Sequence, residues 1–337
     1  MTVWDEPRQA SARSSMSALR GPIFLAGVDR SGIGLLGELL EGHPDVAISR
    51  RTNFWSYYHG RFGSLERPEN LERCVTEMLR YTRIQALHPD RDALLDSVRP
   101  TGATYARLFG ALQEHHLRRV GKSRWGDKSL DSEQHADVIL DAYPDAVMVQ
   151  VIRDPRDRYA SQATHRRAAR GGVGSGTALW LWSLHHARRN EARHPGRYTV
   201  VRYEDLVSTP HEVLQEVCSF VGMPFTPEML EVAPEEIGGT PEGRVAREFT
   251  TASIGRYRHD LTPREIAFIH VVAGHRMAQV GYRVEQVGLS WRDRVVFWLV
   301  DVPRNLLRMG LWEVGRQWAE RRTPRPSARR LTDPERS

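Results

Sequence analysis

The stretch Pro22-Ile-Phe-Leu-Ala-Gly-Val-Asp-Arg-Ser-Gly-Ile-Gly34 decides the fold. It begins with a short apolar run, which is typical of a buried parallel strand. A glycine-containing turn follows, and Leu35-Leu36 and Leu39-Leu40 then recur at helical spacing. Strand, tight loop and helix in this order make the first unit of a fold in which strands and helices alternate.

Two later apolar runs, 146–152 and 198–202, predict further strands of the same buried kind. The glycine-rich segment 171–176 reads as a flexible loop ahead of a Trp-rich helix. Together these elements predict a three-layer α/β fold with a central parallel sheet and a helical insert, whose ligand would lie at the carboxyl ends of the strands. The pattern predicts helices at about 69–120, 155–169, 210–221 and 263–280.

Both ends of the chain differ from its middle. Residues 1–20 are polar and are predicted to form a flexible arm. Residues 286–337 are predicted to form an amphipathic helical extension and a basic tail. Within them, 289–322 places tryptophans among arginines, and Pro303 suits the start of a second helix. Two interpretations are open for 289–322: a helical hairpin packed on the domain, or an amphipathic helix that contacts a membrane surface or a second copy of the chain.

The composition excludes few functions by itself. The net charge of +6 suits a polyanionic ligand, a nucleic acid or a membrane surface equally well. No helix-turn-helix, zinc or RNP-like signature accompanies that charge, so we expect no nucleic-acid partner. The two cysteines, Cys74 and Cys218, lie far apart and show no metal-ligand spacing, so neither a disulfide framework nor a structural metal site is expected.

The sequence also bears on location. The N-terminus lacks the apolar core of a signal peptide, and no apolar run approaches the ~18 residues that a bilayer-spanning helix needs. We therefore expect a cytoplasmic protein, with peripheral membrane contact as a further possibility through the C-terminal extension.

The loop between the first strand and its helix predicts an anion site. Backbone N–H groups and the positive end of the helix dipole converge there, where a phosphate or sulfate group belongs. A nucleoside-triphosphate loop needs Lys and Ser/Thr directly after its second glycine, but this chain has Ile33 and Gly34. A metal-dependent kinase is therefore disfavoured. A sulfuryl group carries less charge than a phosphoryl group and can be transferred without a metal.

Arg30-Ser31-Gly32 with Leu35-Leu36 resembles the RSGTTLL loop of sulfotransferases that use 3′-phosphoadenosine 5′-phosphosulfate (PAPS). The resemblance implies that Arg30 contacts the bridging oxygen and helps the leaving group depart. It implies PAPS as the donor, with no metal required, and a hydroxyl or amine acceptor on a small molecule, phenol, lipid or glycan. The loop residues that would hold the donor are Arg30, Ser31, Gly32, Ile33, Gly34 and Leu35, of which Ile33 and Gly34 replace the family's paired threonines.

Two more stretches extend the resemblance and assign a 21–285 sulfotransferase domain. Arg153-Asp-Pro-Arg-Asp-Arg-Tyr-Ala-Ser161 resembles the family's 3′-phosphate motif, with Arg153 at a strand end and Ser161 about two turns into the next helix. An arginine and a hydroxyl hold a phosphate monoester well. Arg124-Trp-Gly-Asp-Lys-Ser129 resembles the GDKTP stretch, which implies that Lys128 points at the transferred sulfuryl group.

The remaining motifs lie further along the chain. Arg202-Tyr-Glu-Asp-Leu206 resembles the RYEDL stretch, in which the tyrosine, here Tyr203, lines the nucleotide site. Ser253-Ile-Gly-Arg-Tyr-Arg258 and Gly281-Tyr282 resemble the SxGRW and LGY stretches. The segment before them would form a mobile loop over the nucleotide, with Arg247 as its phosphate contact.

The sequence has no glutamate at the position where the resemblance predicts the general base. Many relatives carry a catalytic Glu after an HPD/E-V stretch; His43-Pro-Asp-Val46 is present, but Arg51 stands where Glu is expected. Arginine cannot accept a proton at working pH. Three interpretations are open. Another residue is the base, or the acceptor is as acidic as a phenol and needs little help to lose its proton. In the third, the protein is a non-catalytic relative that binds PAPS or adenosine bisphosphate. The candidate bases are His59 first, then His165, Asp127 and the pair His115-His116.

Overall fold

The computed structural model describes residues 21–165, 171–231 and 251–321. The predicted N-terminal arm, the predicted phosphate contact Arg247 and the end of the predicted 155–169 helix lie outside these residues. The 21–285 boundaries stay a prediction.

A sheet of five parallel strands forms the centre of the molecule, in the order β2-β3-β1-β4-β5. The chain moves to one side of β1 for β2 and β3, and to the other for β4 and β5. This switch point lies at the carboxyl ends of β1 and β4, where ligands of open α/β sheets bind. The strands are β1 (Ile23–Ala26), β2 (Val46–Arg50), β3 (Arg124–Lys128), β4 (Val147–Ile152) and β5 (Tyr198–Arg202).

The prediction of strands β1, β4 and β5 is confirmed, whereas β2 and β3 were not predicted as strands. The sequence of β3, Arg-Trp-Gly-Asp-Lys, has no apolar run. It pairs as a strand because β1 and β2 supply hydrogen-bonding partners on both sides. Its buried Asp127 is also satisfied, since it accepts hydrogen bonds from the hydroxyls of Ser49 (2.9 Å) and Thr52 (2.7 Å).

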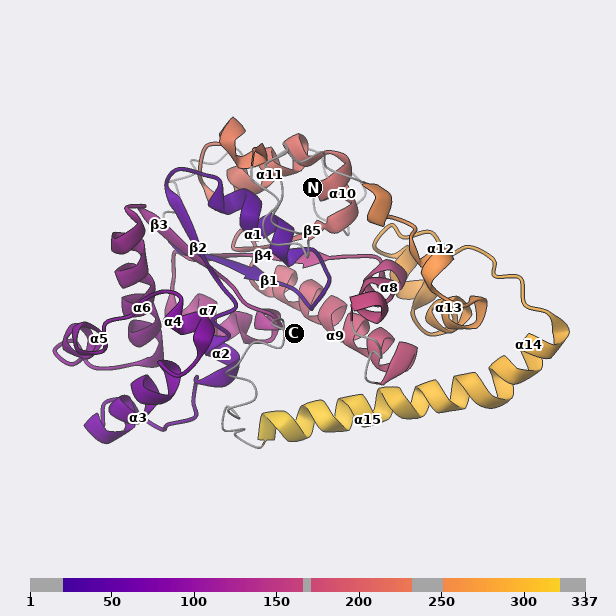
Figure 1. Ribbon diagram of the computed structural model, residues 1–337, viewed down its shortest axis with the longest axis horizontal. Helices are drawn as coiled ribbons and strands as arrows, with labels where there is room; N and C mark the ends of the chain where they lie inside the picture. Colours follow the sequence, from indigo (N-terminus) through magenta and orange to yellow (C-terminus); the bar gives the residue numbers. More distant parts are fainter. Residues whose placement is uncertain (1–20, 166–170, 232–250, 322–337) are drawn as a thin grey trace.

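Helices cover both faces of the sheet, which confirms the predicted three-layer fold (Figure 1). On one face Ile23 and Leu25 of β1 pack with α1 (Ile33–Glu41) and α11 (Pro210–Val221). On the other face of the sheet, Phe24 and Ala26 of β1 pack with α6 (Tyr105–Val120) and α9 (Gly172–Arg193). The alternation follows from the two-residue period of a strand. Remaining elements on these layers are α7 (Ala136–Ala142), α8 (Pro155–His165), α9 (Gly172–Arg193), α10 (Tyr203–Ser208), α12 (Tyr257–Asp260) and α13 (Pro263–Ala278).

The predicted helical insert lies between β2 and β3. An aromatic cluster ties it to the sheet: the Phe54 and Phe109 rings stack at 4.8 Å, and Phe24 of β1 contacts Trp125 edge-on at 5.7 Å. Such pairs add to the burial of apolar area that holds the two parts together. The insert comprises α2 (Phe54–Tyr57), α3 (Pro68–Met78), α4 (Thr82–Gln85), α5 (Arg91–Val98) and α6 (Tyr105–Val120).

The segment 171–176, predicted as a flexible loop, instead forms the first turns of α9. Its glycines permit close packing, because a Cβ on Gly174 would lie 2.3 Å from the Asn305 carbonyl oxygen of α15. Glycine composition indicated flexibility, whereas here the missing side chain lets two helix backbones approach each other.

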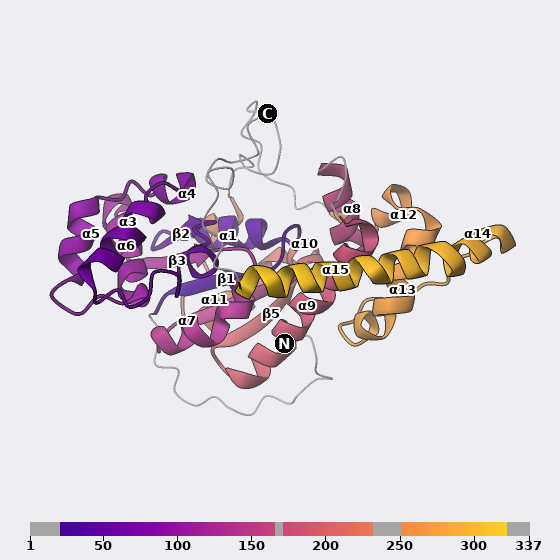
Figure 2. The ribbon, with the colours of Figure 1, turned by 90° about the horizontal axis from the view of Figure 1, so that it is seen from below.

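The C-terminal extension is one continuous helical run and not a hairpin, which corrects that interpretation. It consists of α14 (Trp291–Val296), a π-helical turn (Phe297–Asp301) and α15 (Val302–Arg321). Pro303 follows the π turn directly, a local arrangement that accommodates a proline without ending the helix. The run lies along α9 on the outside of the molecule (Figures 1 and 2). No helix among the described residues is both long and apolar enough to cross a membrane.

Candidate active site

Four strand ends bring the predicted binding residues to one edge of the sheet. The loop containing Arg30 follows β1, Lys128 ends β3, Arg153 follows β4, and Tyr203 begins α10 directly after β5. The carboxyl ends of parallel strands meet at the same edge. The predicted constellation is therefore assembled from residues up to about 170 positions apart, as the fold requires.

The loop after β1 adopts a conformation that depends on one glycine. Gly32 has φ 101°, and a Cβ at this position would lie 2.3 Å from the ring of Tyr203. Arg30 also has a positive φ, 67°, which is uncommon for a residue with a side chain. The α1 helix begins at Ile33, so its first N–H groups face the loop and the helix dipole is positive there.

Hydrogen bonds join the loop to the predicted 3′-phosphate motif. The Nε of Arg30 donates to the Oγ of Ser161 at 2.9 Å. A guanidinium nitrogen of Arg153 donates to the Arg30 carbonyl oxygen at 3.4 Å. Both contacts bridge more than 120 positions of sequence, and they place Arg30, Arg153 and Ser161 together.

Arg153 also contacts the other side of the site. Its guanidinium stacks over the Tyr203 ring at 4.3 Å and donates to the Ser253 carbonyl oxygen at 2.9 Å. The Tyr203 hydroxyl and the Ser253 Oγ lie 2.8 Å apart. The 253–258 stretch is thus held against β4 and β5. Asp157 of α8 secures it further by accepting from the backbone N–H groups of Gly255 and Tyr257.

Lys128 is buried and lies beside the helix N-terminus, since a Cβ on Gly34 would be 4.0 Å from its Nζ. The preceding residue, Asp127, accepts hydrogen bonds from three hydroxyls, those of Ser49, Thr52 and Ser129. Burial raises the pKa of Asp127, although the three hydrogen bonds oppose that shift. A carboxyl enclosed in this way positions Lys128 and is poorly placed to accept a proton from an acceptor.

Arg158 is a buried cation that sequence reasoning left without a role. It is fully buried and donates to the carbonyl oxygens of Asp29 (3.3 Å) and Gly176 (2.9 Å), which joins the loop to α9. Burial lowers its pKa to about 10, with Asp29 and Asp131 acting in the opposite direction. The sequence held one indication of a role for Arg158, because this residue lies inside the 153–161 stretch that resembles the 3′-phosphate motif.

The site fits an oxyanion. Three buried polar atoms around it have no hydrogen-bond partner among the described residues: the Oγ of Ser31, the Nε of Arg153 and the Nε of Arg158. A buried donor without a partner is costly. Hydroxyl and guanidinium donors are the groups that bind phosphate and sulfate. The residues present therefore fit the phosphate and sulfate groups of a donor such as PAPS.

The candidate bases named from sequence are dispersed. His59 packs its ring against Trp55 and Tyr105 of the insert, both at 5.2 Å, and burial lowers its pKa. His115 contacts the His88 carbonyl oxygen, and its neighbour His116 lies on the same insert helix. The side chain of His165 lies outside the described residues.

Arg51, at the position where Glu was expected, lies close to the site. Its backbone N–H donates to the Lys128 carbonyl oxygen at 2.6 Å, and its guanidinium lies 3.9 Å from the Asp29 carboxylate. Its φ of 56° is another uncommon backbone conformation at this edge of the sheet. The positive charge of Arg51 therefore lies close to the loop after β1.

Asp131 is a carboxylate that sequence reasoning missed. Its backbone N–H donates to the Gly27 carbonyl oxygen at 3.3 Å, and its φ of 58° is left-handed. Burial, and then the neighbouring Asp29, raises its pKa. Asp131 is one of the residues that line a pocket of about 450 Å³ between α9 and α15. The other lining residues are Gln134, Leu179, Trp182, Leu311, Trp312, Gly315 and Arg316.

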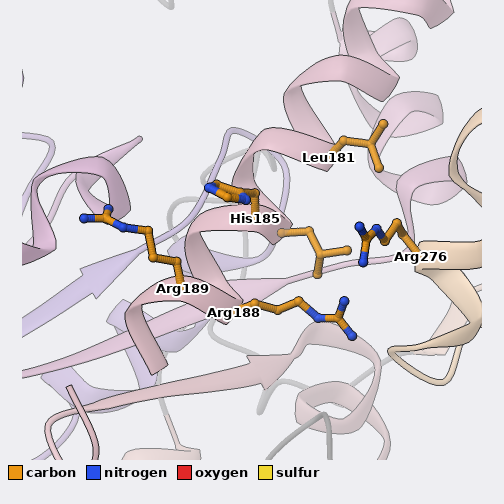
Figure 3. A pocket seen from close by; sticks show the side chains of 6 residues that line it. Leu181, His185, Arg188, Arg189 and Arg276 are labelled. Carbon is orange, nitrogen blue, oxygen red and sulfur yellow. The ribbon is translucent and has the colours of Figure 1, made fainter. Parts of the chain in front are cut away.

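A second pocket, of about 500 Å³, lies between α9 and α13 and shares no lining residue with the loop (Figure 3). Figure 3 shows Arg188 extending toward the side on which Arg276 lies, while Arg189 extends the other way. Arg188 and Arg276 both donate to the side-chain oxygen of Gln279, at 2.6 and 3.1 Å. Within the described residues, no group of His, Cys, Asp and Glu side chains is placed to hold a metal ion.

The family model described as "Sulfotransferase family" matches residues 22–227, so the chain belongs to the sulfotransferase family. Mouse carbohydrate sulfotransferase 5 is 28% identical over 173 residues, covering 43% of this chain and 44% of that protein. The Drosophila melanogaster protein-tyrosine sulfotransferase is 23% identical over 231 residues, covering 66% of this chain and 41% of that protein. The chain thus spans less than half the length of these curated relatives.

A solved structure agrees in fold. The sulfotransferase domain from the curacin biosynthetic pathway superimposes with a TM-score of 0.52 at 19% identity, covering 80% of this chain and all of that domain. At this identity the likeness concerns the fold alone.

Substitution of Arg158 tests whether it organises the site. Arg158→Met leaves the carbonyl oxygens of Asp29 and Gly176 without their donor, so the free energy of unfolding should fall by about 1–3 kcal/mol. Urea unfolding followed by circular dichroism measures this loss. The control Arg99→Met removes an exposed arginine paired with Glu72 and should change stability by about 0.5 kcal/mol or less. Equal losses in both variants would contradict the assignment.

Proposed function

We propose that the protein transfers a sulfuryl group from PAPS to a hydroxyl or amine of a small-molecule, lipid or glycan acceptor. The observation that carries this proposal is that Lys128 and Arg153 lie beside the loop that contains Arg30 and the Ser31 hydroxyl, which has no hydrogen-bond partner among the described residues. Family membership supports sulfuryl transfer as the reaction. PAPS as the donor rests on the residues of this chain.

The roles follow from where each side chain lies. Arg153 and Ser161 would hold the 3′-phosphate, while the loop N–H groups and Tyr203 would hold the 5′ side of the nucleotide. PAPS, when bound, supplies an activated sulfuryl group that passes to the acceptor oxygen or nitrogen as adenosine 3′,5′-bisphosphate leaves. Arg30 and Lys128 would stabilise the negative charge that develops on the leaving and transferred oxygens, a contribution larger in the transition state than in the ground state.

The pocket beside Asp131 is our proposed acceptor site. Leu179, Trp182 and Trp312 supply apolar walls suited to a ring or an alkyl chain, and most small-molecule sites have this character. Asp131, which lines this pocket, would accept the proton that the acceptor hydroxyl or amine loses. A phenol or an amphiphilic lipid fits these walls better than a fully polar sugar.

Product formation from sulfur-labelled PAPS tests the proposed reaction. The wild-type protein should label a phenolic or lipid alcohol acceptor in the presence of EDTA. Lys128→Met should lower kcat by about 10²-fold or more, by analogy with loss of one transition-state donor. Lys122→Met is the control, because Lys122 is the only other lysine of the sequence and lies away from the loop. Its Nζ donates hydrogen bonds to the backbone carbonyl oxygens of Glu41, His43 and Val46. Binding of donor without transfer to any acceptor would favour the non-catalytic alternative.

The pH profile tests Asp131 as the base. Its pKa is raised, so the ionised form is lost as pH falls, and kcat/KM should decline at a higher pH than an ordinary Asp (pKa about 3.9) would give. Asp29, Arg158, Glu133 and Arg316 are the charged groups that share its surroundings.

Asp131→Asn should abolish this acid limb and lower kcat by about 10²–10⁴-fold. Asp141→Asn, which changes an exposed carboxylate on α7, should leave the profile unchanged. An acid limb that persists in Asp131→Asn but disappears in His59→Ala would assign the base to His59 instead.

A further inference from the structure

The C-terminal helical run is amphipathic with its polar side turned toward the protein. Asp301 and Asn305 are buried, and Asn305 accepts a hydrogen bond from the Gly174 N–H of α9 at 3.3 Å. The Arg308 carbonyl oxygen accepts from Ser175 at 3.3 Å. Arg316 lies over the Trp182 ring at 5.7 Å. These polar groups contact the domain alongside the buried Phe297 and the partly buried Val302, Met309 and Trp312.

The outward side of the same run is apolar. A surface helix ordinarily places its apolar stripe against the core and its polar residues in water. Here large apolar side chains are exposed along the length of the run, which Figure 2 shows lying across the outside of the molecule. The most exposed apolar side chains are Trp291 (72%), Leu299 (73%), Leu307 (64%), Leu311 (62%), Val314 (64%) and Trp318 (54%).

Positive charge predominates among the solvent-facing side chains of the run. Among its described residues, 291–318, the exposed charged side chains are Arg292, Arg294 and Arg304. Of the three acidic residues among 291–318, Asp301 is buried between Arg264 and Arg304, while Asp293 and Glu313 are half-buried beside Arg264 and Arg316.

We propose that residues 291–318 dock the protein on an anionic lipid surface, with the helical run lying in the plane of the headgroups. Leucine and valine side chains would enter the acyl boundary, tryptophans at both ends would sit at headgroup level, and the arginines would meet lipid phosphates. A second copy of the chain is the competing occupant. It would bring two sets of exposed arginines together, whereas anionic headgroups carry the opposite charge.

Membrane docking has a consequence for the acceptor that rests on the proposed function. Leu311 and Gly315 of α15 line the same pocket as Asp131. A protein docked through α15 would hold this pocket next to the lipid, so an amphiphilic acceptor could enter without crossing water. The docking itself depends only on the helical run and is tested without any turnover.

Vesicle cosedimentation of the full chain tests the docking. The wild-type protein should pellet with vesicles of phosphatidylcholine and phosphatidylglycerol, and much less with phosphatidylcholine alone. The triple variant Leu299→Ser, Leu307→Ser, Val314→Ser should bind the anionic vesicles about tenfold or more weakly. A matched triple variant, Val120→Ser, Val271→Ser, Val284→Ser, removes exposed valines elsewhere and should bind as the wild type does.

A charge variant tests the arginines separately. Arg292→Gln with Arg294→Gln should reduce the preference for anionic over neutral vesicles and should leave circular dichroism unchanged. Analytical ultracentrifugation without lipid distinguishes the competing occupant. A concentration-dependent dimer that the leucine and valine variant abolishes, with no vesicle binding, would assign the face to a second copy and overturn the proposal. A monomer that pellets with neither vesicle overturns it as well.

Discussion

The gathering of positively charged side chains at one end of a parallel sheet is the constraint on which the rest of the structure depends. Arg30 lies in the loop after β1, and Lys128 of β3, Arg153 after β4 and Arg158 of α8 approach this loop. Like charges in a partly buried site repel unless carbonyl oxygens, carboxylates or a bound anion compensate them. Backbone oxygens of Asp29 and Arg30 compensate part of this charge, and the donors that lack a partner mark where an anion completes it.

The sequence predicted that Arg30, Lys128 and Arg153 lie at one edge of the sheet, and the structure brings them together there, whereas no sequence pattern indicated the proposed acceptor pocket. Arg30, Arg153 and Lys128 follow strands and occur in ordered motifs, so local spacing was enough to find them. Strand β3 could not be found by apolar periodicity, because its charged residues are stabilised by hydroxyls from β2 and the following turn. Asp131 became a candidate only when α9 and α15 enclosed the space beside it, and such long-range enclosure leaves no local pattern.

The proposed donor site and the helix that closes the proposed acceptor pocket belong to different parts of the chain. The family match ends at residue 227 and includes every strand of the sheet and the loop. The helix that closes the proposed acceptor pocket, α15, lies beyond that match and packs on α9 through glycine and polar contacts. The sequence pattern of 289–322 indicated an amphipathic helix, and the structure adds that its apolar side faces outward.

The most direct test of the central claim is calorimetric titration with adenosine 3′,5′-bisphosphate, compared with adenosine 5′-monophosphate, which lacks the 3′-phosphate. The bisphosphate should bind much more tightly to the wild-type protein. In Arg153→Ala its affinity should fall by about ten- to a hundredfold, the equivalent of roughly 1.5–3 kcal/mol for a hydrogen bond to a charged group. Equal affinities for the two nucleotides, or an unchanged dissociation constant in Arg153→Ala, would contradict the 3′-phosphate site and the function built on it.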